Sequence, residues 1–113
     1  MRLLPEPAPE TLTLASVLDA LGDPVRLQLV RRAAANPGLT CAVADLNVPK
    51  STLTNHWRTL REAGVVRMAV DGRCRRIWLR TDELQDRFPE LLDVILRLSA
   101  AEGSVEPVLS GAA

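Results

Sequence analysis

The stretch from Leu39 to Gly64, LTCAVADLNVPKSTLTNHWRTLREAG, decides the fold. It predicts a short helix over about residues 41–46, a turn at residues 47–48 and then a longer helix. Pro49 fits the first position of the longer helix, because its missing N–H would have no partner there. Gly64 fits the end, because a residue without Cβ readily adopts the left-handed conformation. The stretch therefore predicts a helix-turn-helix unit.

The longer of these two helices, about residues 49–63, has one apolar and one polar side. Leu53, Trp57 and Leu60 recur at spacings of four and three, which predicts a buried stripe. The polar side carries short hydroxyls, an amide and cations, which can donate to base edges and phosphates and let the helix approach DNA closely. The alternative is an ordinary surface helix with a solvated polar face. The residues predicted to contact DNA from this helix are Lys50, Ser51, Thr52, Thr54, Asn55, His56 and Arg58.

The formal net charge is zero, but the charges are unevenly distributed along the chain. Residues 50–80 hold eight Lys and Arg against two Asp and Glu, a net charge of +6. The remainder holds six against twelve, a net charge of −6. Binding to a polyanion depends on the local patch and not on the total charge. A basic segment inside an acidic frame therefore favours a nucleic-acid partner.

Beyond the helix-turn-helix unit, the hydrophobic period changes from that of a helix to that of a strand. The alternation over about residues 66–79, interrupted by Asp71-Gly72, predicts a β-hairpin with a tight type I′ turn. Cations gather near its tip, which predicts a positive wing that follows DNA phosphates. A hairpin whose charges only block edge pairing is the alternative. The cations assigned to DNA binding in this wing are Arg73, Arg75 and Arg76.

Helices are also predicted on both sides of this region. Residues 12–21 carry an apolar stripe, and Asp23 and Pro24 supply an N-cap and a first-turn residue for a helix to about residue 35. Thr81 can cap a last helical region, whose apolar face over residues 88–98 is broad for a chain of this size. We expect a second copy of the chain to cover part of that face.

The chain resembles the ArsR/SmtB-type winged-helix repressors of bacteria, over most of its length from about Leu14 to Leu98. The resemblance lies in ALGDPVRLQLV at 20–30, PKSTLTNHWRTLREAGVV at 49–66 and DGRCRRIWLR at 71–80. It implies a symmetric homodimer joined through the first and last helices. It also implies binding to a palindromic operator in double-stranded DNA, and repression that a signal relieves.

The resemblance does not extend to the metal-sensing sites of the family. Many relatives have a cysteine pair before the recognition helix, where this chain has Ala42 and Ala44, with Cys41 one position away. The last helix has no histidine, and the only one, His56, is interpreted as supporting the recognition helix through a hydrogen bond or a phosphate contact. Zinc or a similar ion needs three or four N, O or S ligands. We therefore expect no metal site and no cofactor, and the effector stays unknown.

The two cysteines fit a reducing compartment and provide no disulfide framework. Cys41 is interpreted as a small buried hydrophobe and Cys74 as a strand residue. The alternative is a thiol redox-responsive regulator that uses either residue. Arg73, Arg75 and Arg76 would stabilise a thiolate at Cys74, so Cys74 is the better candidate.

At 113 residues and 47% hydrophobic residues, the chain is sufficient for one domain with a modest core. We predict a flexible, proline-rich arm over residues 1–10, a winged helix domain for DNA binding and dimerisation over residues 11–101, and a flexible tail over residues 102–113. The expected fold class is mainly α with a small β-hairpin (α+β), in which helices precede a two-stranded wing and a C-terminal helix.

These patterns predict a sequence-specific DNA-binding regulator that acts as a repressor. The alternative from another class is a small dimeric interaction module whose basic patch meets an acidic protein surface. An enzyme is not expected, because the sequence has one histidine, no tyrosine, no glycine-rich phosphate loop and no metal cluster. The absence of a long apolar run and of a signal-peptide pattern predicts a cytoplasmic protein without a membrane partner.

Overall fold

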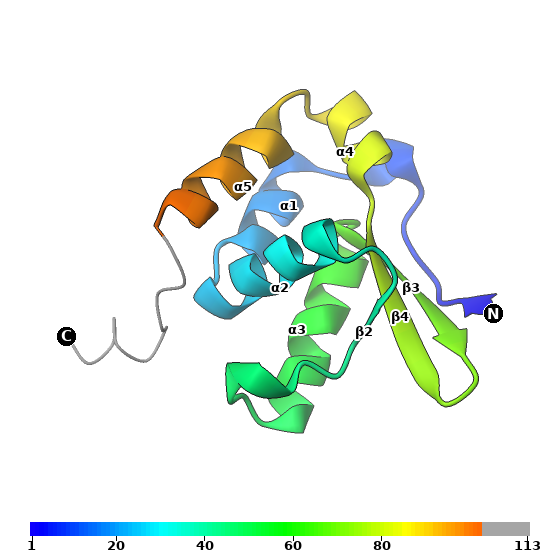
Figure 1. Ribbon diagram of the computed structural model, residues 1–113. Coiled ribbons are helices and arrows are strands. Elements are labelled where there is room, and N and C mark those ends of the chain that lie inside the picture. Colours follow the sequence, from blue (N-terminus) through cyan, green and yellow to red (C-terminus); the bar gives the residue numbers. More distant parts are fainter. Residues whose placement is uncertain (103–113) are drawn as a thin grey trace.

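The computed structural model describes residues 1–102, so the predicted tail lies outside the described residues from Gly103 onward. Helices and a small antiparallel sheet pack around one core, and Figure 1 shows the sheet extending away from the helices on one side. This α+β arrangement confirms the expected winged helix-turn-helix fold class. The elements are β1 (Arg2–Leu3), α1 (Leu14–Leu21), α2 (Pro24–Ala35), β2 (Leu39–Thr40), α3 (Lys50–Glu62), β3 (Val66–Asp71), β4 (Cys74–Leu79), α4 (Thr81–Arg87) and α5 (Leu91–Ala101), with short 3₁₀ turns η1 (Pro9–Thr11) and η2 (Ala44–Leu46).

The sheet has four strands in the order β1-β3-β4-β2, where the sequence predicts only the β3–β4 hairpin. The tip of this hairpin also differs from the prediction. Asp71 pairs with Cys74, so the two-residue loop is Gly72-Arg73 and not Asp71-Gly72. Gly72 has a positive φ of 63° and Arg73 does not, which excludes type I′ and is typical of a type II′ turn. The shift by one residue places Arg73 at the tip.

The helix boundaries follow the predicted caps in α2 but not in α3 or α4. The Asp23 side chain accepts hydrogen bonds from the backbone N–H groups of Val25 and Arg26 at 2.8 and 3.0 Å, which confirms the predicted N-cap. Pro49 is the N-cap of α3 and precedes its first helical residue. Thr81 is the first residue of α4 and does not cap it.

The first helix of the predicted helix-turn-helix unit is much shorter than expected. In place of a helix over residues 41–46, the structure has only the three-residue turn η2. The preceding residues are extended instead, because β2 pairs with β4 and the Cys41 N–H donates to the Arg75 carbonyl at 3.0 Å. Six residues are too few to sustain a helix against such pairing. Asn47, with a φ of 53°, then turns the chain into α3.

The N-terminal segment lies along the sheet, where the sequence predicts a free arm. Arg2 and Leu3 pair with Val70 and Ala69 of β3, and the Leu4 N–H donates to the Met68 carbonyl at 2.9 Å. The Arg61 side chain of α3 donates to the Pro5 carbonyl. Residues 2–7, which we call the N-terminal strap, thus contact both α3 and the β3–β4 wing.

The core confirms the predicted stripe of α3, since Leu53, Trp57 and Leu60 are all buried. They pack with residues of α2 and of the sheet, including Leu29 and Ile77, which are fully buried. Burial of apolar area at about 25 cal/mol per Å² is the main force that holds these layers together. The core thus fixes which side of α3 faces inward and leaves the polar side in solvent.

A buried arginine joins the strap to the start of α4. The Arg80 side chain is fully buried, donates to Glu83 at 2.7 Å and donates to the Pro7 carbonyl at 3.0 Å. Arg67 bonds Glu6 with two short contacts and also reaches Glu83 at 3.1 Å. The hydrogen bond from Arg80 lowers the pKa of the Glu83 carboxyl, despite partial burial. We call Glu6, Arg67, Arg80 and Glu83 the ion network.

Acidification is expected to weaken this ion network. Because the pKa of Glu83 is lower in the folded than in the unfolded chain, its contribution to the free energy of unfolding is present above about pH 5 and is lost as the pH falls through the lowered value. Because a glutamine at position 83 cannot titrate, the Glu83→Gln variant should lose less of its free energy of unfolding between about pH 6 and pH 3 than the unchanged chain does. Urea unfolding across that range measures this, with Glu62→Gln on the exposed side of α3 as control. Equal losses in the Glu83→Gln variant and the unchanged chain would contradict the prediction.

Candidate nucleic-acid interface

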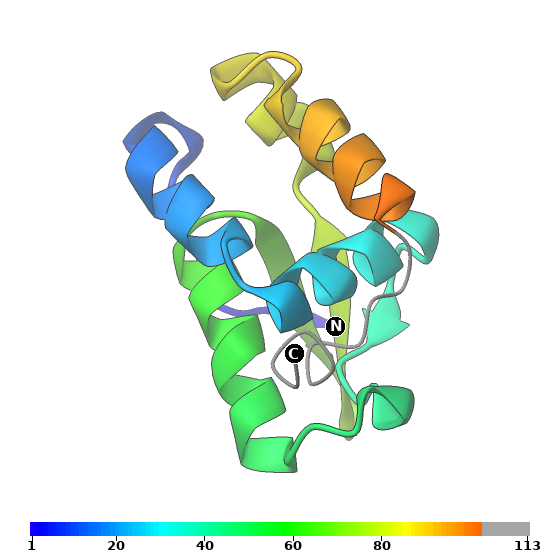
Figure 2. The same ribbon diagram turned by 90° about the vertical axis from the view of Figure 1, so that its left-hand side faces the viewer.

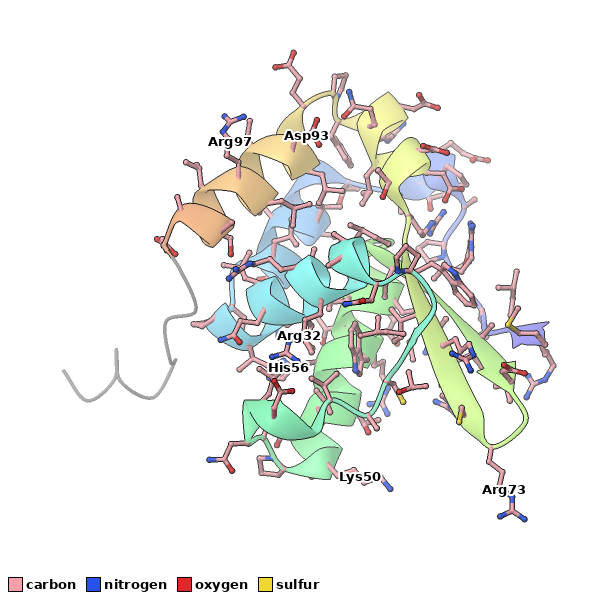
Figure 3. The ribbon with its side chains drawn as sticks, viewed as in Figure 1. Arg32, Lys50, His56, Arg73, Asp93 and Arg97 are labelled. Atoms are coloured by element: carbon pink, nitrogen blue, oxygen red, sulfur yellow. The ribbon has the colours of Figure 1, made fainter. Side chains whose placement is uncertain are left out.

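The polar side of α3 is open to solvent along its length. Every predicted contact residue of this helix except His56 is exposed, and Figure 3 shows Lys50 pointing away from the body of the molecule. The Arg58 guanidinium donates to the Asn55 side-chain oxygen at 3.0 Å, one helical turn apart. That oxygen keeps a second lone pair and the Asn55 amide keeps its donors, so Asn55 can still pair with a base edge.

Five cations converge on the hollow between α3 and the wing. This α3–wing groove has a volume of 680 Å³, and none of the described residues that line it is Asp or Glu. Figure 3 shows Lys50 and Arg73 projecting from the same end of the molecule, one from α3 and one from the hairpin tip. The uncompensated charge makes this groove the strongest candidate for phosphate binding. The cations that line it are Lys50, Arg58, Arg61, Arg73 and Arg75.

The other cations of the basic segment have internal acidic partners. Arg67 and Arg80 belong to the ion network with Glu6 and Glu83. Arg76, which the sequence assigns to DNA binding, forms an ion pair with Asp71 at 2.9 Å and donates to the Gly38 carbonyl at 2.9 Å. Its neighbours Arg73 and Arg75 line the groove, whereas Arg76 points to the opposite face of β4. A count of charges along the sequence therefore overstates the cations available to DNA.

His56 is half-buried and faces α2 instead of the solvent. The Arg26 guanidinium lies 3.1 Å from His56 Nδ1, and because arginine can only donate, Nδ1 accepts. Arg26 also donates to the Ala20 carbonyl at 2.6 Å, so it links α1, α2 and α3. The hydrogen bond expected of His56 is thus present, and it joins α3 to α2. Arg26 lies in the stretch ALGDPVRLQLV at 20–30, but its residue type and position did not indicate that its side chain would join three helices.

The two cysteines both line the α3–wing groove. Cys41 lies next to β4, where its N–H donates to the Arg75 carbonyl at 3.0 Å, and Cys74 is the first residue of β4. Both are free thiols, Cys41 half-buried and Cys74 exposed.

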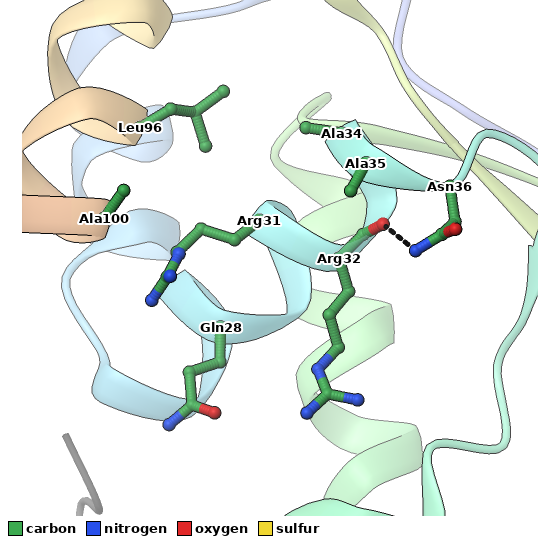
Figure 4. Close-up of a pocket in the computed structure, with 8 residues that line it drawn as sticks. All are labelled: Gln28, Arg31, Arg32, Ala34, Ala35, Asn36, Leu96 and Ala100. Carbon is green, nitrogen blue, oxygen red and sulfur yellow. Dashed lines mark hydrogen bonds between the residues drawn. The ribbon is translucent and has the colours of Figure 1, made fainter. Parts of the chain in front are cut away.

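A second hollow, of 550 Å³, lies between α2 and α5 (Figure 4) and shares no lining residue with the α3–wing groove. Arg32 on its edge pairs with Asp45 through two hydrogen bonds of 2.7 Å, which lower the pKa of the Asp45 carboxyl. This pair fixes η2 to α2 and so helps position the entry to α3.

Two absences apply to the described part of the chain. Over residues 1–102, no three His, Cys, Asp or Glu side chains are arranged so that they could hold a metal ion. None of the helices in that span combines the length and apolar character that crossing a bilayer requires.

Comparison with known proteins assigns this arrangement to a class. A family described as a helix-turn-helix domain matches residues 21–69, which include α2, α3 and part of β3. The uncharacterized HTH-type transcriptional regulator YceK of Bacillus subtilis is 32% identical over 84 residues, which span 72% of this chain and 84% of that protein. The uncharacterized HTH-type transcriptional regulator MJ1325 of Methanocaldococcus jannaschii is 28% identical over 83 residues, 72% of this chain and 89% of that protein.

The chain therefore belongs to the helix-turn-helix transcriptional regulators. It is a DNA-binding regulator, and α3 with the α3–wing groove is the candidate surface for that binding.

Proposed function

We propose that the protein is a dimeric repressor of the ArsR/SmtB type that binds a palindromic operator. The acid-free cationic groove beside an exposed polar helix carries this proposal. In the proposed complex α3 enters the major groove, while Arg73 and Arg75 of the wing follow the phosphates. Residues 11–101 carry both DNA binding and dimerisation, and a regulator with this partner works in the cytoplasm.

Exposed leucines on the first and last long helices support the dimer. Leu14 and Leu18 on α1 are 48% and 44% exposed, and Leu98 on α5 is 58% exposed. Figure 2 shows α1 and α5 on the same side of the molecule, flanking α2. A second copy placed there would bury these side chains and set two recognition helices about one helical turn of DNA apart.

Repression is the direct consequence of such binding. A dimer that covers an operator overlapping a promoter excludes RNA polymerase from the same DNA. Selection of bound fragments from genomic DNA identifies the operator, and transcription from a promoter that contains it measures the direction of regulation. Activation by the protein would overturn the repressor assignment but not the DNA-binding function.

The recognition helix is expected to determine base preference. Asn55→Ala removes a side chain that can form two hydrogen bonds with adenine, so operator binding should weaken by about 1–3 kcal/mol. The preference for particular base pairs should weaken with it. Titration of operator and scrambled DNA by fluorescence anisotropy measures both effects.

A wing variant is the matched comparison. Arg73→Ala should weaken binding to operator DNA and to scrambled DNA nearly equally. It should also lower the slope of log affinity against log salt by about one unit per lost phosphate contact, roughly two per dimer. Arg76→Ala should change this slope much less, because Arg76 is paired with Asp71. If the wing variant alters base preference and Asn55→Ala alters only the salt slope, the two roles are reversed. If neither operator nor scrambled DNA binds in a salt-dependent way, the alternative of a dimeric module that binds an acidic protein surface replaces the proposal.

A further inference from the structure

The α3–wing groove has an apolar floor beneath its cationic rim. Val43, Trp57 and Met68 lie in this floor and are all buried, and the Trp57 indole N–H is satisfied by the Cys41 carbonyl at 2.9 Å. No polar atom of these three side chains is therefore left without a partner. The part of this floor that is exposed, 8% of Val43, 4% of Met68 and 2% of Trp57, is therefore apolar.

Contact with a DNA backbone does not account for such a floor. Phosphates and sugars are held by charged and hydrogen-bonding groups, and the five cations on the rim already provide these. An apolar floor below convergent cations is instead typical of a pocket for a small molecule, and 680 Å³ lies inside the usual range of about 300–1,000 Å³. The groove thus matches a ligand with an apolar body and a negative group.

We propose that the groove binds an organic anion with an aromatic or aliphatic body, and that the bound anion prevents DNA binding. The body would lie on Val43, Trp57 and Met68, and the anionic group would pair with Arg58, Arg61 or Arg75 at the rim. Arg58 and Arg75 are also predicted DNA contacts, so anion and DNA compete for the same charges. The second half of this proposal rests on the proposed function, whereas anion binding itself does not.

Anion binding is tested without DNA by a matched pair of fluorescent probes. 8-Anilinonaphthalene-1-sulfonate has an aromatic body and a sulfonate, and N-phenyl-1-naphthylamine has a similar body without the charge. In the Trp78→Phe background Trp57 is the one tryptophan left, so energy transfer from Trp57 reports binding of the probe to the protein, and the substitutions below locate the site. We expect the sulfonate to bind about tenfold more tightly than the neutral probe. Equal affinities would overturn the requirement for an anion.

A substitution that fills the floor separates this site from the apolar dimer face. Ala42 is exposed and lines the groove, so Ala42→Phe should occupy the space and abolish sulfonate binding while leaving the rim cations in place. Ala34→Phe, an exposed alanine of the other hollow, is the control and should bind the probe normally. If both variants bind the probe equally well, the site is elsewhere and the proposal fails. Circular dichroism confirms that both variants are folded.

Competition with the operator tests the regulatory half. For simple competition the apparent dissociation constant of the operator rises linearly with sulfonate concentration, by about tenfold at ten times the probe's own dissociation constant. Because Ala42 lines the same groove, the operator affinity of Ala42→Phe is measured first without sulfonate, and adding sulfonate should then leave that affinity unchanged. A plateau at high sulfonate would mean that anion and DNA bind together, which overturns competition. Sulfonate binding by a protein that binds no DNA would reject the proposed function and leave the anion site standing.

Discussion

Gly64→Ala is expected to lower the free energy of unfolding by about 3 kcal/mol, the largest loss of stability that we predict for a single methyl group. Gly64 has a φ of 85°, and a Cβ built on it would lie 2.2 Å from Leu12 Cδ2. Leu12 is only 2% exposed, so its side chain cannot move into solvent to relieve the contact. The left-handed backbone and the close packing therefore both oppose the substitution. Urea unfolding of the variant measures the loss.

Two further variants separate these causes. Gly72 at the hairpin tip has a φ of 63° but nothing within 4 Å of an added Cβ, so Gly72→Ala should cost only about 1 kcal/mol. In a Leu12→Ala background the contact with an added Cβ at residue 64 disappears. Adding Gly64→Ala to that variant should then lower the free energy of unfolding by only about 1 kcal/mol, as for Gly72→Ala. A cost that stays near 3 kcal/mol in that background would show that packing against Leu12 is not responsible.

Leu18→Asp is expected to convert the proposed dimer into a monomer and to weaken operator binding by about 10²–10⁴-fold. Leu18 is exposed on α1, so an aspartate there leaves the core unchanged, whereas in the dimer it would be buried without a partner. A monomer contacts one half-site and loses the effective concentration that links the two recognition helices. Sedimentation equilibrium and operator titration measure the two effects.

Leu3→Asp is the matched control for the position of the interface. Leu3 is 58% exposed, but it lies on β1 at the sheet edge, away from α1 and α5. The Leu3→Asp variant should remain a dimer, and Leu98→Asp on α5 should dissociate like Leu18→Asp. If Leu3→Asp dissociates and Leu18→Asp does not, the chain dimerises through its sheet edge.

Local signals in the sequence predicted the helices and the wing because each depends on neighbouring residues. The Asp23-Pro24 cap and the apolar spacing in α3 all act within one or two turns of helix, and the structure confirms them. The short η2 turn was not predictable in this way. Its geometry depends on pairing between β2 and β4, which are more than thirty residues apart along the chain.

The exposed side of α3 could be predicted from the sequence, but the set of arginines available to DNA could not. The exposed side of α3 follows directly from its buried stripe. Which arginines remain available depends on distant partners, such as Gly38 for Arg76 and Glu6 for Arg67. Glu6 lies in a proline-rich segment that carries no periodic signal, so neither its strand neighbours nor its ion pair could be inferred from the sequence.

The N-terminal strap limits the movement of α3 relative to the wing. It bonds α3 through the Pro5 carbonyl and the wing through Leu4 and Glu6, so it braces the helix and the hairpin against each other. Two braced elements approach the double helix as one rigid unit with a fixed spacing. The bending and twisting needed for a close fit then fall to the DNA, and the cost depends on the stiffness of the base steps that the protein never touches. We expect base pairs between the two half-sites to influence affinity through their deformability.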